Sequence, residues 1–225
     1  MPAPPPANLL SVFPENLSAQ LFAHAKLVEL ATDEVLFLAG DPGDGCYRVE
    51  QGLLKVSMIA ATGAERILAI IGPGAIVGEL STIDGLPRSA SVAAVRDSQL
   101  TFVSRAAFQA FAGSHPDVYK HLVMLLAARL RDTDGVLAAG SFLPLKGRVA
   151  RALLDLSEAF GQDVGQGRIL IRQKVSQSDG AAMAGIAREN VSRILNDWIR
   201  DKLVTRLSGY YCLENKAKLK RESAL

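Results

Sequence analysis

Cysteine is scarce in this sequence. The 225 residues include two cysteines, Cys46 and Cys212, which lie in separate parts of the chain. Two thiols exclude a disulfide framework and a cluster of cysteine metal ligands, and they are typical of a protein from a reducing compartment. Cys46 falls in a short apolar stretch, where a thiol more often packs as a small apolar group than reacts as a redox switch.

Long hydrophobic runs are also missing. No stretch of about 18 apolar residues passes without a charge, a glycine or a proline, so we expect no membrane span. The Pro-rich start, Met1–Leu10, lacks the positive charge and apolar centre of a signal peptide. We therefore expect a cytoplasmic protein. Because no nucleophile–base pair, cluster of metal ligands or nucleotide-hydrolysis loop is evident, we expect neither an enzyme nor a metal site.

The net charge is only +2, but it is unevenly distributed. Residues 1–145 carry 10 basic and 14 acidic side chains, whereas residues 146–225 carry 15 basic and 9 acidic ones. This asymmetry suggests that the basic half meets a polyanion. A surface that is unevenly charged without any partner is the alternative interpretation.

Residues 18–105 are expected to form a β-barrel. A short helix is predicted over residues 18–30, with Ser18 as a possible cap. Apolar stretches then alternate with Gly-containing turns, as is typical of a sandwich or barrel. These stretches are Val35–Leu38, Tyr47–Val49, Leu53–Ile59, Ile67–Ile71, Val92–Ala94 and Leu100–Val103. A small antiparallel barrel can enclose one small ligand.

Residues 106–144 are expected to form a dimerisation helix and a hinge, helical from Ala106 to about Ala139, with a boundary at His115–Pro116. Six positions follow the 4,3,4,3,4 spacing of a coiled-coil seam: Val118, Leu122, Leu125, Arg129, Asp132 and Val136. This seam predicts a homodimer, although the helix could instead pack on its own domain. Asp132, Asp134 and Gly135 are poor helix residues, which leaves open whether the helix continues past them.

Residues 145–225 are expected to form a winged helix-turn-helix. The expected helix, loop, strand, two helices and hairpin are Gly147–Phe160, Gly161–Gly167, Arg168–Ile171, Gln177–Ala184, Ala187–Arg200 and Leu203–Leu213. Gly185 allows the close turn between the two short helices, and Ser208–Gly209 is a hairpin turn pair. The basic tail Lys216–Arg221 is expected to be loose.

The helix over Ala187–Arg200 has an apolar face and a polar one. Arg188, Glu189, Ser192 and Arg193 gather near its N-terminal end, which meets base edges in a helix-turn-helix. Arginine can donate two hydrogen bonds to guanine and glutamate can accept one from cytosine. Ser192 and Arg172 could donate to phosphates, which position a protein on DNA. A solvated charged face is the plainer interpretation of the same pattern.

The segment AREN-VSRIL at residues 187–195 closely resembles the recognition helix of the Crp–Fnr family of bacterial transcription regulators. The resemblance continues through RDKLV at residues 200–204 and GRVARALL at residues 147–154, and covers about residues 20–213. It implies base contacts by Arg188, Glu189 and Arg193, a homodimer on a palindromic site in double-stranded DNA, and contact with RNA polymerase. Arg188 suits one branch of the family and Ser192 another, which leaves the half-site sequence open.

The segment Gly78–Ser89 offers two glycines, a carboxylate and an Arg-Ser pair. Arginine suits phosphate oxygens, backbone N–H groups near Gly78 could add an anion nest, and a carboxylate could accept from a ribose hydroxyl. An internal ion pair between Glu79 and Arg88 would use the same residues without a ligand.

This segment also resembles the phosphate-binding cassette of cyclic-nucleotide-binding domains. The resemblance implies that Glu79 holds the ribose and that Arg88 and Ser89 hold the cyclic phosphate of cyclic AMP, helped by backbone groups of Gly78 and Leu80. Thr133 matches a central-helix threonine that reaches the purine. Two features depart from the family. Asp134, the next residue, stands where the family has a serine, and the cassette is one residue shorter. The choice of nucleotide therefore stays open.

Other sensor types of the family fit less well. Two cysteines are too few for an Fe–S cluster. His24, His115 and His121 lie outside the cassette and the predicted barrel, where a haem ligand is not expected.

The sequence therefore predicts an α+β chain with three parts: a barrel or jelly roll over residues 18–105, a dimerisation helix and hinge over residues 106–144, and a winged helix-turn-helix over residues 145–225. The main hypothesis is a dimeric regulator gated by cyclic AMP or another cyclic nucleotide. The alternatives are a regulator that binds DNA without a cyclic nucleotide, and a cyclic-nucleotide module that acts through protein contacts. Activation or repression and the target genes stay open.

Overall fold

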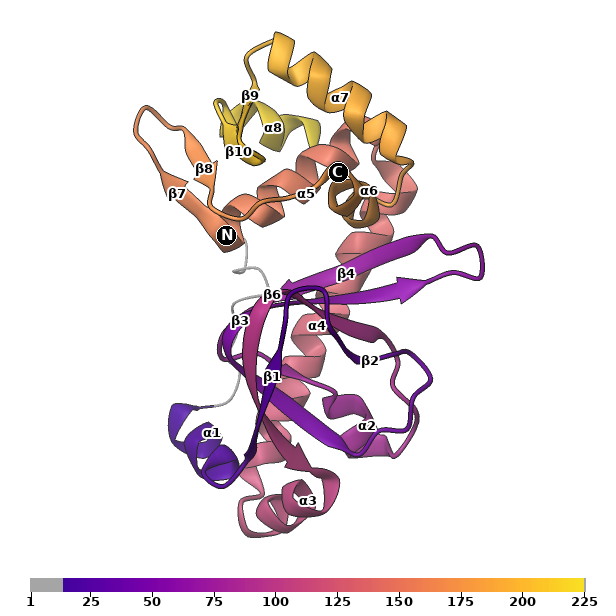
Figure 1. The fold of residues 1–225 in the computed structure, drawn as a ribbon, viewed down its shortest axis with the longest axis vertical. Helices are drawn as coiled ribbons and strands as arrows, with labels where there is room; N and C mark the ends of the chain where they lie inside the picture. The colour runs from indigo at the N-terminus through magenta and orange to yellow at the C-terminus, as the bar shows by residue number, and fades with distance from the viewer. Residues whose placement is uncertain (1–13, 225) are drawn as a thin grey trace. The chain divides into compact units, whose positions relative to one another are not determined.

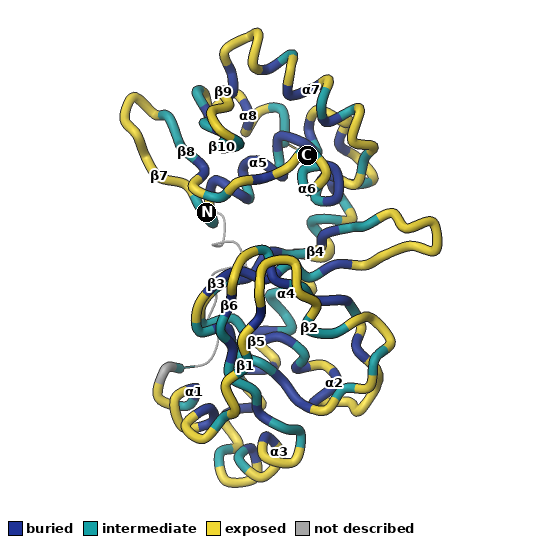
Figure 2. The backbone as a smooth tube through the Cα atoms, in the orientation of Figure 1, coloured by how far each residue is buried: buried dark blue, intermediate teal, exposed yellow. Residues whose placement is uncertain are grey.

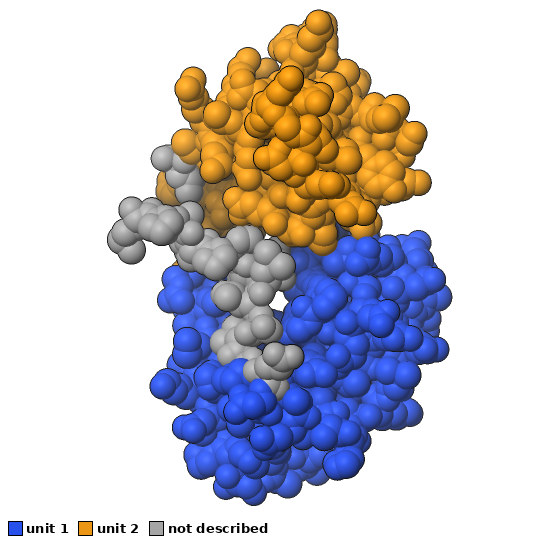
Figure 3. Space-filling view, turned by 90° about the vertical axis from the view of Figure 1, so that its left-hand side faces the viewer, with its two compact units in different colours: residues 1–132 blue, residues 133–225 orange. Residues whose placement is uncertain are grey.

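The structure is a computed structural model that describes residues 14–224. The predicted Pro-rich start therefore lies outside the described residues. Tertiary contacts divide the chain into two compact units, residues 1–132 and residues 133–225, shown in different colours in Figure 3. The three-part division drawn from the sequence stays a prediction.

The first unit is built on one antiparallel sheet with jelly-roll-like connections (Figure 1). Its elements before the long helix are α1 Glu15–Phe22, β1 Lys26–Leu30, β2 Val35–Phe37, β3 Gly45–Ile59, β4 Glu65–Ile71, β5 Ile76–Val77, α2 Glu79–Asp84, β6 Ser91–Ser104 and α3 Arg105–Ser114. The main strand order is β1-β6-β3-β4, with β2 paired to β6 and β5 paired to β3. Apolar side chains of these strands fill the interior, among them Val49, Leu54 and Leu100. The sheet does not close into a full barrel, but the predicted antiparallel architecture is confirmed.

Several strand boundaries differ from the prediction. Residues 26–30 form β1, paired in register with β6, and not the second half of a helix. Ser18 lies inside α1, where its hydroxyl accepts from Arg48, so it is no cap. The two predicted strands on either side of Gly52 are one strand, β3, and Val92–Ala94 and Leu100–Val103 are both parts of β6. Gly52 bends β3 at a left-handed φ of 97° without ending it.

The long helix α4 runs from Asp117 to Phe142, directly after Pro116. The helix continues through Asp134 and Gly135, a point that the sequence left open. The guanidinium of Arg151 packs where a Gly135 Cβ would stand and donates to the Gly135 carbonyl at 3.0 Å. This contact offsets part of the roughly 1 kcal/mol that a glycine costs in a helix.

The first half of the predicted coiled-coil seam packs inside its own unit and is not available to a partner. Its first three positions, Val118, Leu122 and Leu125, are buried in the core of their own unit with residues of α1, α3 and the sheet. The exposed apolar stripe of α4 is displaced by one residue along the chain. It consists of Tyr119, Val123, Leu126, Leu130 and Leu137, of which Leu126 is half-buried and the others are exposed. We call it the α4 stripe.

The second unit after α4 is a winged helix. Its elements are α5 Leu145–Phe160, β7 Gly161–Asp163, β8 Ile169–Ile171, α6 Gln177–Ala184, α7 Arg188–Arg200, β9 Val204–Leu207, β10 Tyr210–Leu213 and α8 Lys216–Glu222. The four strands pair in the order β7-β8-β10-β9. The hairpin prediction is confirmed, since Ser208 and Gly209 both have positive φ between β9 and β10.

Two predictions for this unit are wrong. The segment after α5 was expected to be a loop throughout, but its first three residues form β7, which pairs with β8. The tail after β10 was expected to be loose, but it forms α8. Asn215 caps that helix by accepting from the Lys218 N–H, and Leu219 is fully buried where α8 packs against α5.

Burial in both units follows the amphipathic pattern, with dark buried stretches facing each unit's interior (Figure 2). Within residues 14–224, no helix is long and apolar enough to cross a bilayer.

Candidate functional site

Residues at the helix ends fix where α6 stops and α7 begins in the second unit. Ser176 caps α6 in a capping box with Asp179, so the first turn has its N–H groups satisfied. Gly185 ends α6 at a left-handed φ of 64°, a conformation that glycine adopts without strain. The chain then starts α7 after Ala187. These ends produce the tight turn of a helix-turn-helix.

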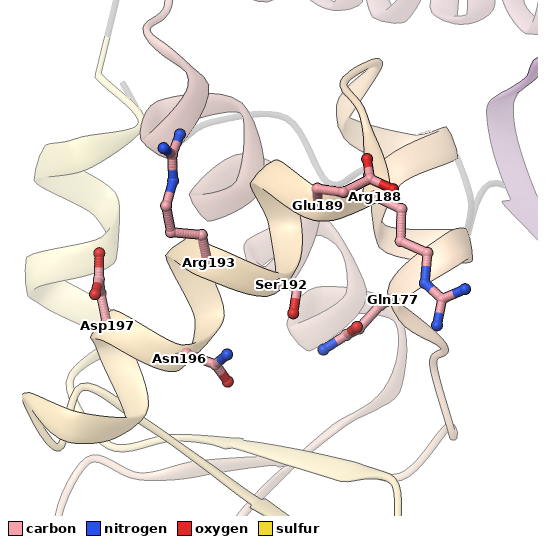
Figure 4. A pocket seen from close by; sticks show the side chains of 7 residues that line it. All are labelled: Gln177, Arg188, Glu189, Ser192, Arg193, Asn196 and Asp197. Atoms are coloured by element: carbon pink, nitrogen blue, oxygen red, sulfur yellow. The ribbon is translucent and has the colours of Figure 1, made fainter.

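The buried face of α7 anchors it to the unit and directs its polar face outward. Val191, Ile194, Leu195 and Trp198 are all buried, as the spacing predicts. The opposite face borders an open hollow of about 510 Å³. Figure 4 shows the side chains that line it: Gln177, Arg188, Glu189, Ser192, Arg193, Asn196 and Asp197.

The structure brings four predicted DNA-contacting residues together at this hollow. Arg188 and Glu189 are exposed, and within the described part of the chain neither makes a hydrogen bond or an ion pair through its side chain. Arg193 is exposed and donates one hydrogen bond to Asn190 at 3.0 Å, which holds its guanidinium along the helix. Arg172, the fifth predicted residue, is exposed in the segment after β8 and does not line the hollow.

Three lining residues, Gln177, Asn196 and Asp197, were not predicted from the sequence. Gln177 is the first residue of α6, and Asn196 lies one helical turn after Ser192 on α7. Both present a neutral amide to the hollow (Figure 4). The helical period alone would have found Asn196, because residues i and i+4 share a face. Gln177 comes from another helix, and nothing in the sequence joins it to this surface.

The cassette of the first unit is a short helix between two glycines. Gly78 and Gly85 flank α2 with left-handed φ of 81° and 77°. A Cβ on Gly78 would stand 2.4 Å from Nη1 of Arg88, so only glycine fits there. The cassette therefore wraps closely around the Arg88 side chain.

Glu79 is buried at the start of α2. One carboxylate oxygen accepts from Nη1 of Arg129 on α4, and the other, Oε2, is buried without a hydrogen-bond partner. An unsatisfied buried carboxylate oxygen is costly, and a ligand hydroxyl would satisfy it. Arg129 was expected in the coiled-coil seam and is instead the residue that joins α4 to the cassette.

Arg88 is buried as well. Its Nη1 donates to the carbonyl oxygens of Gly45 and Gly78 at 2.7 and 2.9 Å, and its Nη2 donates to Asp44 at 2.9 Å. The predicted alternative of an ion pair between Glu79 and Arg88 is wrong, since each pairs with another residue. Nε of Arg88 is buried and has no partner.

The remaining predicted ligand residues are placed as follows. Ser89, directly after Arg88, is exposed, and so is the side chain of Leu80 on α2. Thr133 and Asp134 are exposed residues of α4, and Thr133 follows Arg129 by one helical turn.

Cys46 lies on β3 in the core, as expected for a packing residue. Burial, and then the negative charge of Glu79, raises the pKa of its thiol to about 12. A thiol that is protonated at neutral pH is a poor nucleophile. Within residues 14–224, no three histidine, cysteine or acidic side chains are grouped in a way that could hold a metal ion.

Comparisons with known proteins match a region of each unit. Residues 27–115 match the family described as "Cyclic nucleotide-binding domain", and residues 147–222 match the one described as "Crp-like helix-turn-helix domain". The chain is 33% identical over 187 residues to the "CRP-like cAMP-activated global transcriptional regulator" of Mycobacterium tuberculosis, covering 81% of this chain and 83% of that protein. It is 38% identical over 161 residues to the "Cyclic AMP receptor protein" of Thermus thermophilus, covering 72% of this chain and 71% of that protein.

Among solved structures, the fold is similar to that of the c-di-GMP responsive global regulator CLP of Xanthomonas campestris. The TM-score is 0.80 at 24% sequence identity, covering 90% of this chain and all of that one. At that identity the likeness concerns the fold alone.

Proposed function

Because this chain belongs to the Crp–Fnr family of DNA-binding transcription regulators, we propose that it is a homodimer that binds a palindromic DNA site when a cyclic nucleotide, in the first place cyclic AMP, occupies its cassette. The observation that carries this proposal is the pair of unsatisfied buried atoms in the cassette, Oε2 of Glu79 and Nε of Arg88. An acceptor and a donor of this kind suit a ribose hydroxyl and a phosphate.

In the proposed complex, Glu79 accepts the ribose 2′-hydroxyl, and Arg88 and Ser89 donate to the cyclic phosphate. The backbone groups of Gly78 and Leu80 lie at the start of α2, where N–H groups are free to bind an anion. Thr133 and Asp134 of α4 are proposed to face the purine, following the family resemblance. Asp134 stands where the family has a serine, and its carboxylate can only accept hydrogen bonds. This residue would therefore change which edge of the purine the site prefers.

On the DNA side, Arg188, Glu189 and Arg193 are proposed to read bases from the major groove. All three line one open hollow on the polar face of α7, whose opposite face is buried. Ser192 and Arg172 are proposed to donate to phosphates. RNA polymerase is the protein partner that the family implies.

The α4 stripe is proposed as the dimer interface. Its first four residues follow the 4,3,4 spacing of a coiled coil, and Leu137 lies one heptad after Leu130. Four of the five are exposed, and Leu126 is half-buried. Two copies of the stripe would pack by two-fold symmetry, which matches the symmetry of a palindromic site.

Arg129 offers a route for gating. It lies on α4 and donates a hydrogen bond to Glu79 inside the cassette. A ligand that binds Glu79 therefore acts on the helix that carries the α4 stripe. A ligand can shift the regulator between two states only by binding one more tightly than the other.

Calorimetry tests the sensor half of the proposal. The unaltered protein should bind cyclic AMP with micromolar-range affinity, and the Arg88→Ala variant should show no heat of binding. Arg96 is exposed on β6, so the Arg96→Ala variant should bind cyclic AMP as the unaltered protein does. Selection from a random DNA library with and without cyclic AMP then tests gating. Enrichment of one palindrome only with the nucleotide supports it.

A second candidate function is a regulator that binds DNA without a cyclic nucleotide. It is favoured by one observation: Glu79 and Arg88 each already have an ion-pair partner within the chain. Equal enrichment of one palindrome with and without cyclic AMP, and no heat with any cyclic nucleotide, would establish this alternative.

A further inference from the structure

Asp44 accepts a hydrogen bond from Nη2, one of the two Arg88 nitrogens that a phosphate would use. The guanidinium has five N–H donors, and both of those on Nη1 are committed to the carbonyl oxygens of Gly45 and Gly78. The ring of Phe37 lies 4.3 Å from Cζ and covers one face. An anion that binds Arg88 through two hydrogen bonds must therefore use Nε and Nη2.

A carboxylate already occupies one of these two nitrogens. Asp44 Oδ1 accepts from Nη2 at 2.9 Å, and Nε beside it has no partner. The Arg88 side chain is only 2% exposed, whereas that of Asp44 is 68% exposed. Asp44 is thus the outer cover of a buried cation, and its charge has the same sign as a phosphate.

The backbone around Asp44 is held in place. Its carbonyl accepts from the Arg105 N–H at 2.8 Å, and the Gly43 carbonyl accepts from Nη2 of Arg105 at 2.8 Å. A Cβ on Gly43 or on Gly45 would lie 2.1 Å from a neighbouring atom, so the loop packs closely on both sides. Only the exposed side chain of Asp44 is free to turn away.

From this arrangement we propose that Asp44 is a side-chain gate of the cassette. In the ligand-free protein its carboxylate neutralises Arg88, and a cyclic phosphate displaces it while the loop backbone stays in place. Asp44 therefore lowers the affinity for any ligand that presents a phosphate to Arg88, because the phosphate must break an existing ion pair and then lies close to a like charge. This inference rests on the proposed binding of a cyclic nucleotide.

The test is calorimetry of the full-length protein with cyclic AMP at low and high salt. Asp44→Asn keeps the size of the side chain and removes its charge, and Asp44→Ala removes the hydrogen bond as well. Both variants should bind cyclic AMP more tightly, by roughly threefold to tenfold, the scale of an exposed charge pair. The gain should shrink as salt screens the repulsion.

Asp41→Asn is the matched control. Asp41 lies in the same loop and accepts from the Leu38 N–H, a hydrogen bond that the asparagine oxygen can keep, but it has no contact with the Arg88 guanidinium. The affinity of this variant for cyclic AMP should stay within about twofold of that of the unaltered protein. Removing a charge that does not touch the Arg88 guanidinium has a small effect. Thermal unfolding without ligand shows that each variant is folded.

The outcomes separate this inference from the proposed function. Binding by the unaltered protein with equal or weaker binding by folded Asp44→Asn overturns the gate and leaves the cyclic-nucleotide function intact. Binding by Asp44→Asn alone supports a gate that holds the cassette closed. An absence of binding by all variants overturns both.

Discussion

Replacing Leu130 by alanine is expected to weaken the proposed dimer without unfolding the protein. Residues Val123, Leu130 and Leu137 on the α4 stripe are 65%, 63% and 69% exposed in the single chain. Full burial of a leucine contributes about 1.5–3 kcal/mol, so covering the exposed part of Leu130 contributes about 1–2 kcal/mol in each subunit. Since two-fold symmetry places the residue in both subunits, the variant should lose about 2–4 kcal/mol, which is roughly a thirtyfold or greater rise in the dimer dissociation constant.

Sedimentation across a range of protein concentrations measures that constant. Leu207→Ala is the matched control, because Leu207 is an even more exposed leucine at the wing and lies outside the stripe. Leu122→Ala is the opposite control: it lies in the core of its own unit, so it should lower the free energy of unfolding by about 2–5 kcal/mol. If Leu130→Ala dimerises normally while Leu122→Ala dissociates without losing stability, the stripe has been assigned to the wrong side of α4.

Four further predictions follow from the second unit and the core. Arg193→Ala should weaken binding to the selected palindrome by about 1–3 kcal/mol while binding to random DNA changes little, as measured by competition. Asn196→Ala should relax base preference at one position of each half-site in a random-library selection, whereas Gln162→Ala, an exposed amide on β7, should not. Leu219→Ala should lower the free energy of unfolding by about 2–5 kcal/mol in urea, a loss that a loose tail could not produce. Cys46 should resist a thiol reagent at pH 8 in a variant without the other cysteine, because its pKa of about 12 keeps the thiol protonated; rapid labelling of the folded protein would contradict this.

The helix-turn-helix was predictable almost to the residue because its signals are local. Ser176, the small residues before Gly185 and the 3.6-residue period of Val191, Ile194 and Trp198 all lie within one stretch of chain. The family assignment and the α+β fold class drawn from this region and from the cassette are confirmed.

The strand boundaries were less predictable because glycines act differently in strands and in turns. Gly52 looks like a turn, but β3 pairs with β6 on both sides of it, and the paired strand keeps the chain extended. Likewise, α8 looks like a solvated basic tail, and only the burial of Leu219 against α5 makes it a helix. Hydrogen bonds and contacts with distant segments decide both cases.

The sequence by itself determined the helical period of α4, the composition of the cassette and the charged face of α7, because these depend on neighbours a few positions away. The tertiary structure decided which face of α4 stays exposed. A heptad spacing fits two adjacent registers equally well, and packing against α1, α3 and the sheet buries one of them. It also decided the partners of Glu79 and Arg88, since Arg129 and Asp44 come from segments 50 and 44 residues away, a distance over which only the folded chain brings charges together.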